Sequence, residues 1–271
     1  METNVIYNED CIGENGMCRL PENSIDMILA DLPYGTTACK WDSIIPLAPL
    51  WEQYKRITKE RGAIVLTASQ PFTTKLIQSN IESFRYEWIY QKRVASNFAL
   101  AKKRPLKEHE NVLVFYKKQP TYNPIKEQRK GSGLERVKNP YHTNSDEGGE
   151  VMGNLKRNNA NQEYTELKFP SSIQEFNNRA TDARGLHPTQ KPVELFEYLI
   201  KTYTNENEIV LDNVLGSGTT AVACLKTNRQ FIGFEKEEEY YNIALKRIGK
   251  FDKSYCKELP KSERPAQKQL F

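Results

Sequence analysis

The sequence predicts an α/β fold in which helices pack on a twisted, mainly parallel sheet. Three observations support this prediction. Short apolar runs are bounded by turn residues, helical patterns lie between these runs, and one run leads into a glycine-containing turn at the start of a helix. With 271 residues, of which 38% are hydrophobic and 27% charged, the chain can form one globular domain with a sizeable insertion.

Four apolar runs have the length and composition of parallel strands that are buried on both faces. In chain order they are 24–30, 62–67, 208–211 and 229–234. Helical patterns occupy four other segments. These segments are 47–59, 72–78, 193–203 and 219–227. Two more runs, 86–90 and 111–116, predict an antiparallel pair of strands at one edge of the sheet.

Apolar periodicity is lost between about residues 118 and 183, where Asn, Lys, Glu and Gly predominate. We interpret 118–183 as an inserted target-recognition region. It would divide one domain into a first half, 1–117, and a second half, 184–250. A polar tail follows at 251–271.

Several protein classes are disfavoured by composition. No apolar run reaches the roughly 18–20 residues that span a bilayer, and the N-terminus has no charged start followed by an apolar core. We therefore expect a cytoplasmic protein without a membrane segment. The five cysteines and three histidines are scattered and form no C-x-x-C pair, so we expect neither a metal site nor a disulfide framework.

Positive charge is concentrated in one part of the chain, although the net charge is only +4. Between Arg85 and Lys138 there are 14 Lys or Arg against five Glu and no Asp. Each cluster alone could be a solvated loop, but the total excess beside aromatic residues favours a polyanion such as duplex DNA. The candidate nucleic-acid contacts are Lys92, Arg93, Lys102, Lys103 and Arg104.

A cofactor site is predicted in the second half of the chain. A strand runs into Asp212, a turn with Gly216 and Gly218 follows, and a helix opens at Thr219. Glycines allow the backbone to approach a ligand closely, and a helix start offers free N–H groups. Glu235, 19 positions after Gly216, ends the next strand, where a carboxylate can bind ribose hydroxyls.

This turn has only two close glycines and lacks the third glycine of a dinucleotide fingerprint. A nucleoside cofactor without pyrophosphate therefore fits better than NAD. S-adenosylmethionine is a molecule of that kind.

The first strand ends in the tetrapeptide Asp31-Leu32-Pro33-Tyr34. As structure alone it could be a capped turn. Chemically, Asp31 and the Leu32 carbonyl are acceptors, and Tyr34 offers a flat face for a base. Two acceptors on an exocyclic amine would direct its nitrogen lone pair toward a methyl sulfonium, so that catalysis rests on positioning. A base must leave the duplex to enter such a pocket.

The tetrapeptide together with 212–218 resembles the motifs of DNA amino-methyltransferases that modify adenine N6 or cytosine N4. Because the tetrapeptide precedes the cofactor turn and the basic region lies between them, the order resembles that of the beta class. The resemblance implies a Rossmann-like S-adenosylmethionine-dependent methyltransferase fold with permuted motif order, of the restriction-modification type. Further matches to the family are 7–11, 187–192 and 233–235.

Site residues follow from this resemblance. It implies that Asp31, Leu32, Pro33 and Tyr34 hold the target base. The residues implied to surround the cofactor are Asp10, Cys11, Asp31, Thr189, Lys191, Asp212, Gly216, Ser217, Gly218, Thr219 and Glu235. The chain departs from the family pattern at Leu32, where proline is usual, and at 213–214, where proline-phenylalanine is more common.

The function that these patterns favour is methylation of adenine N6 in duplex DNA at specific sites, because Asp rather than Ser opens the tetrapeptide. The alternatives are methylation of cytosine N4 or of RNA, a glutamine-modifying protein methyltransferase, and a non-catalytic nucleic-acid-binding protein on this scaffold. Two partner hypotheses stay open. One is a homodimer, and the other is docking of Gln267–Phe271 on a replication sliding clamp.

Overall fold

The computed structural model describes residues 1–36, 42–138, 165–179, 190–252 and 255. The chain divides into two compact units, Met1–Asn123 with Ser172–Phe271, and Pro124–Ser171. The second unit holds β6 (Glu127–Gln128), α3 (Ser132–Lys138) and β7 (Leu167–Lys168), and its two strands pair antiparallel.

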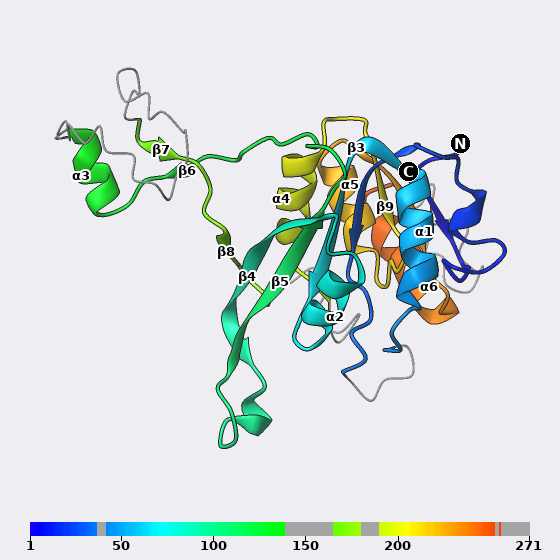
Figure 1. The fold of residues 1–271 in the computed structure, drawn as a ribbon, viewed down its shortest axis with the longest axis horizontal. Coiled ribbons are helices and arrows are strands. Elements are labelled where there is room, and N and C mark those ends of the chain that lie inside the picture. Colours follow the sequence, from blue (N-terminus) through cyan, green and yellow to red (C-terminus); the bar gives the residue numbers. More distant parts are fainter. Residues whose placement is uncertain (37–41, 139–164, 180–189, 253–254, 256–271) are drawn as a thin grey trace, which may run out of the picture. The chain divides into compact units, whose positions relative to one another are not determined.

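The first unit, drawn in Figure 1, is built on an eight-stranded sheet. The strand order is β1-β10-β9-β2-β3-β5-β4-β8. From β1 to β3 all neighbouring strands are parallel, whereas β5 runs antiparallel to β3 and to β4. The strands are β1 (Val5–Tyr7), β2 (Ile25–Ala30), β3 (Thr58–Ala68), β4 (Phe84–Ser96), β5 (Lys107–Phe115), β8 (Ile173–Phe176), β9 (Ile209–Asp212) and β10 (Gln230–Phe234).

Helices cover both faces of this sheet. One apolar cluster joins alternate strand residues such as Met27 and Leu29 to α4 (Val193–Tyr203), α5 (Thr219–Lys226) and α6 (Glu238–Ile248). The opposite cluster joins the intervening residues to three other helical elements. They are η1 (Met17–Arg19), α1 (Leu47–Ile57) and α2 (Phe72–Ser79). Burial on both faces explains why the parallel strands read as continuous apolar runs.

The predicted α/β architecture is confirmed. Most predicted strands and helices lie within a few residues of the observed ones, but the strand predicted at 86–90 is β4, which runs on to Ser96. A second difference is β3. We predicted a helix to residue 59 and a strand from residue 62, but the helix ends at Ile57 and the strand begins at Thr58. The extra residues form an irregularity in the pairing with β2, where a Cβ on Gly62 would come within 2.5 Å of Thr58 Cγ2.

Part of the 118–183 stretch belongs to the first unit. β8 pairs parallel with β4, and the Asn178 side chain donates to the Val94 carbonyl at 2.8 Å and accepts its N–H at 3.1 Å. Gln267–Phe271 and most of the tail lie outside the described residues. None of the helices in the described ranges is long and apolar enough to cross a membrane.

Candidate active site

A cavity of about 540 Å³ opens at the carboxyl ends of β2 and β9. These neighbouring strands lie where the strand order reverses, because the chain continues from β2 to β3 on one side and from β9 to β10 on the other. Ligands of open α/β sheets bind in the crevice at such a switch point. The volume is in the usual range for small-molecule sites.

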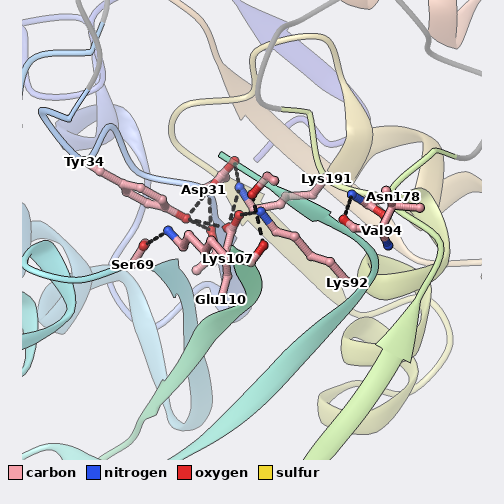
Figure 2. A network of polar contacts seen from close by, with 11 residues as sticks. Asp31, Tyr34, Ser69, Lys92, Val94, Lys107, Glu110, Asn178 and Lys191 are labelled. Atoms are coloured by element: carbon pink, nitrogen blue, oxygen red, sulfur yellow. Dashed lines mark hydrogen bonds and ion pairs between the residues drawn. The ribbon is translucent and has the colours of Figure 1, made fainter. Parts of the chain in front are cut away.

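Asp31, the first residue after β2, is the centre of a polar network in this cavity (Figure 2). Its Oδ1 accepts hydrogen bonds from the Tyr34 hydroxyl at 2.8 Å and from the Thr67 hydroxyl. Its Oδ2 accepts a hydrogen bond from Lys191 Nζ at 2.6 Å. A carboxylate has about four lone-pair sites, so these three donors leave about one acceptor site on Asp31 for a substrate N–H.

Two further charges complete the network. Lys191 Nζ lies 3.2 Å from Glu110 Oε2, and Lys92 Nζ lies 2.6 Å from Glu110 Oε1. The side chains of Lys191, Glu110 and Lys92 are only 6%, 10% and 12% exposed, so solvent screens these pairs weakly. Negative and positive groups alternate from Asp31 through Lys191 and Glu110 to Lys92.

The ion pairs of this network keep its buried carboxylate and ammonium groups charged, because each group shifts the pKa of its partner. Burial alone would raise the pKa of Glu110, but Lys191 and Lys92 outweigh it and lower that pKa to about 2. Burial would lower the pKa of Lys191, yet Asp31 and Glu110 raise it well above its usual range. Burial and the neighbouring Asp31 raise the pKa of Tyr34, so its hydroxyl stays a neutral donor.

The turn after β9 forms the opposite wall of the cavity. Gly216 and Gly218 adopt φ of +54° and +84°, which residues with a Cβ rarely do. A Cβ on Gly218 would also lie 3.2 Å from the Ala244 Cβ. Glu235, at the end of β10, accepts the Gly216 N–H at 2.7 Å and the Glu237 N–H at 2.9 Å.

This wall fits a nucleoside. Glu235 is 8% exposed and lines the cavity beside the glycine turn, and its carboxylate keeps acceptor sites for ribose hydroxyls. Asp10 and Cys11 also line the cavity, and they follow β1, which pairs with β10. Carboxylates at the ends of adjacent strands therefore face a space that has room for an adenosine-sized molecule.

Asp212 is a buried carboxyl group at the base of this wall. It accepts hydrogen bonds from the Thr220 hydroxyl and from the Val214 N–H at 3.1 Å. Burial raises its pKa to about 7, against the lowering effect of these hydrogen bonds.

We predict that Asp212→Asn changes the pH dependence of folding. A carboxyl group with a raised pKa in the folded state favours folding at low pH, and this advantage is lost as pH rises from about 4 through about 7. The wild type should therefore lose stability relative to Asp212→Asn by on the order of 1 kcal/mol per pH unit. Urea unfolding of both proteins without cofactor at pH 5, 6 and 7 measures this difference, and a constant difference would contradict the assigned pKa.

The cavity brings together most of the residues predicted from sequence. The predicted residues that line it are Asp10, Cys11, Asp31, Leu32, Pro33, Tyr34, Lys191, Asp212, Gly216, Ser217, Thr219 and Glu235. Gly218 packs behind the wall against Ala244, so its part is conformational. Thr189 lies outside the described residues.

The predicted nucleic-acid contacts divide into two groups. Lys92 pairs with Glu110 and belongs to the polar network around Asp31. The other four, Arg93, Lys102, Lys103 and Arg104, are exposed on or near the β4–β5 hairpin.

Sequence reasoning missed Glu110, Thr67 and Asp42. Asp42 accepts the N–H groups of Gly35 and Thr36, both at 2.9 Å, and thereby holds the turn that follows the tetrapeptide. The only signal for Glu110 was an acidic residue at the border of an apolar strand within a basic stretch. Thr67, inside an apolar run, carried no signal.

Fold and site together define a Rossmann-like S-adenosylmethionine-dependent methyltransferase with permuted motif order. A family model described as DNA methylase matches residues 25–246. The chain therefore belongs to the N6/N4 DNA methylase family, whose members use S-adenosylmethionine and act in DNA methylation of the restriction-modification type.

Individual relatives are similar over most of the chain. The type II methyltransferase M.HpaI of Haemophilus parainfluenzae is 28% identical over 250 residues, which cover 84% of this chain and 69% of the relative. The DNA adenine methyltransferase YhdJ of Escherichia coli K12 is 29% identical over 268 residues, which cover 91% of this chain and 83% of the relative.

Two solved structures have the same fold. The M1.HpyAVI–SAM complex has a TM-score of 0.60 at 22% identity, over 90% of this chain and 98% of that one. The PvuII DNA methyltransferase, described as cytosine-N4-specific, has a TM-score of 0.63 at 15% identity, over 94% and 92%.

Proposed function

We propose that this methyltransferase modifies adenine N6 at a specific sequence in duplex DNA, and that the target adenine is flipped out of the helix. The observation that carries the proposal is the Asp31 carboxylate, which lies in the same cavity as the glycine turn and retains an acceptor site. A relative similar over nine-tenths of the chain is named as a DNA adenine methyltransferase.

Three residues of the tetrapeptide, Asp31, Leu32 and Tyr34, have distinct tasks in this proposal. Asp31 and the Leu32 carbonyl accept the two hydrogens of the exocyclic amine, which otherwise delocalises its lone pair into the ring. Lys191 and Tyr34 orient the Asp31 carboxylate before the base arrives. S-adenosylmethionine, when bound, supplies an electrophilic methyl group. Catalysis then rests on preorganised dipoles and on position.

Base flipping follows from the depth of the site. Asp31 has a side chain only 24% exposed, and Leu32 is buried. A base in a stacked duplex cannot present its amine to such acceptors, so it must rotate out of the helix. The Tyr34 ring, which stacks on Phe72 with centroids 5.5 Å apart, is held as a platform for the base.

Cytosine N4 presents the same kind of amine and is the alternative target. One structural neighbour is described as cytosine-N4-specific, but at 15% identity it bears on the fold alone. Asp at the first position of the tetrapeptide favours adenine.

Nucleoside analysis tests the proposal. The protein is incubated with labelled S-adenosylmethionine and unmethylated duplex DNA, the product is digested to nucleosides for mass spectrometry, and the methylated sequence is mapped. We expect N6-methyladenine from the wild type. N4-methylcytosine would replace the proposed target base, and methylation of RNA alone would overturn the proposal.

A further inference from the structure

Strands β4 and β5 extend beyond the rest of the sheet as a hairpin, which projects downward in Figure 1. Their pairing is interrupted between Gln91 and Ser96, so the outer part of the hairpin is a separate short arm. Its tip consists of η2 (Phe98–Leu100) and the turn that follows.

The tip is a structured turn. Asn97 adopts φ of +68°, which short polar residues tolerate better than most, and so starts the turn. Backbone hydrogen bonds of 2.8 to 3.1 Å then close it. Their donors are the N–H groups of Leu100, Ala101, Lys103 and Arg104. This backbone holds Phe98 outward, with 60% of its surface exposed.

The segment that carries this exposed aromatic ring is rich in positive charge. Residues 94–107 contain three Lys and one Arg but no Asp or Glu. Lys102, Lys103 and Arg104 are all exposed. An apolar side chain among unopposed cations matches duplex DNA, whose phosphates lie beside stacked, apolar base faces.

The arm is tied at its base to the catalytic network. Lys107 donates a hydrogen bond to Ser69, and three residues further along β5 Glu110 contacts Lys191 (Figure 2). On the other strand, Asn178 fixes Val94 through both of its backbone groups. Three strand residues span only about 10 Å, so DNA that offers a base to Asp31 passes close to the base of this arm, from which the tip with Phe98 projects.

We propose that Phe98 enters the duplex as an apolar wedge beside the target base and stabilises the flipped state, while Lys102, Lys103 and Arg104 bind the flanking phosphates. This inference rests on the proposed function. Apolar side chains that enter between bases are an established way to compensate for lost stacking.

The test compares two DNA duplexes that carry the sequence mapped for the wild type. One duplex is fully paired, and in the other the target base lies opposite an abasic site, so that less free energy is needed to flip it. We expect Phe98→Ala to reduce kcat/KM roughly 10- to 100-fold on the paired duplex. On the abasic duplex it should recover to near the wild-type value.

Two variants serve as controls. Lys102→Ala/Lys103→Ala should lose activity on both duplexes and reduce the salt slope of binding by about 2, as expected for phosphate contacts. Ile81→Ala, which truncates a 61% exposed apolar residue away from the arm, should behave as wild type.

The outcomes separate the two proposals. Wild-type activity on the paired duplex tests the proposed function. The wedge is tested by the ratio of kcat/KM for Phe98→Ala to kcat/KM for the wild type, compared between the two duplexes. If Phe98→Ala equals the wild type on paired DNA, or is impaired equally on both duplexes, the wedge is overturned.

Discussion

Replacing Asp31 with Ala or Asn is expected to reduce kcat/KM for methyl transfer by roughly 100- to 1,000-fold, the effect of removing one preorganised polar group from a catalytic site. Asn keeps the shape of the side chain but presents an amide that must face Lys191 or the Tyr34 and Thr67 hydroxyls. Either orientation disturbs the acceptor that the substrate amine needs. Methylated nucleosides formed per minute give the rate for each protein.

A matched control lies on the same strand. Asp26 precedes Asp31 by five residues, but its carboxylate pairs with Lys59 at 2.7 Å and accepts the Ile209 N–H, away from the cavity lining. Asp26→Asn should therefore keep the wild-type rate per folded molecule. Should Asp31→Asn keep more than a tenth of the wild-type rate, catalysis does not depend on this carboxylate.

Local sequence patterns predicted those parts of the fold that depend on local burial. The helix at Val193–Tyr203 has the predicted bounds because its apolar residues repeat with the helical period and Pro192 precedes it. β2 and β9 were recognisable because strands buried on both faces are apolar throughout.

Long-range pairing could not be predicted in the same way. β8 is a four-residue strand with no buried residue, and it forms because Ile173–Phe176 pairs with the edge of β4. The early start of β3 likewise depends on a pairing of Thr58 with Ile25 that nothing near Thr58 encodes. Such elements are determined by partners distant in sequence.

The candidate site shows the same division. Asp31 and Gly216 were predicted because each belongs to a short motif whose chemistry is complete within a few residues. Thr67 contacts Asp31, and Glu110 is linked to Asp31 through Lys191, only because the strand order places β3 beside β2 and β5 beside β3. Lys92 was interpreted as a DNA contact because it belongs to a cluster of positive charges. In the structure it is largely buried and pairs with Glu110. A count of charges along the sequence cannot tell a buried, paired lysine from an exposed one.

Replacing Lys191 with Met should produce the largest loss of stability among the variants considered. Lys191 forms ion pairs with both Asp31 and Glu110, and its side chain is 6% exposed. Removing one partner of a buried ion pair leaves an uncompensated charge and costs about 3–5 kcal/mol. Lys201→Met, on a lysine 48% exposed, should cost less than about 0.5 kcal/mol. Urea unfolding near neutral pH measures both.

A double variant identifies the cause of that loss. In Lys191→Met/Glu110→Gln, one of the two carboxylates that lose their Lys191 partner is replaced by a neutral amide. The double variant should therefore lose less free energy of unfolding than the sum of the losses in the two single variants. If the losses simply add, Lys191 contributes by packing alone, and the charge argument is wrong.

The pH dependence gives an independent test of the same network. A carboxyl group whose folded pKa is lowered contributes stability that is present above its usual pKa and is lost as pH falls toward the folded value. For wild-type Glu110 this pH window runs from about 4.5 down to about 2.

Without Lys191 the pKa of Glu110 rises, because burial is then opposed mainly by Lys92 and Lys107. Once the two curves are aligned at pH 7, Lys191→Met should consequently lose less stability than the wild type between about pH 4.5 and pH 2, because the pKa of its Glu110 differs less between the folded and unfolded states. Since Lys191 also orients Asp31, methyl transfer by this variant should fall at every pH, which separates the effect on catalysis from the pH-dependent effect on folding.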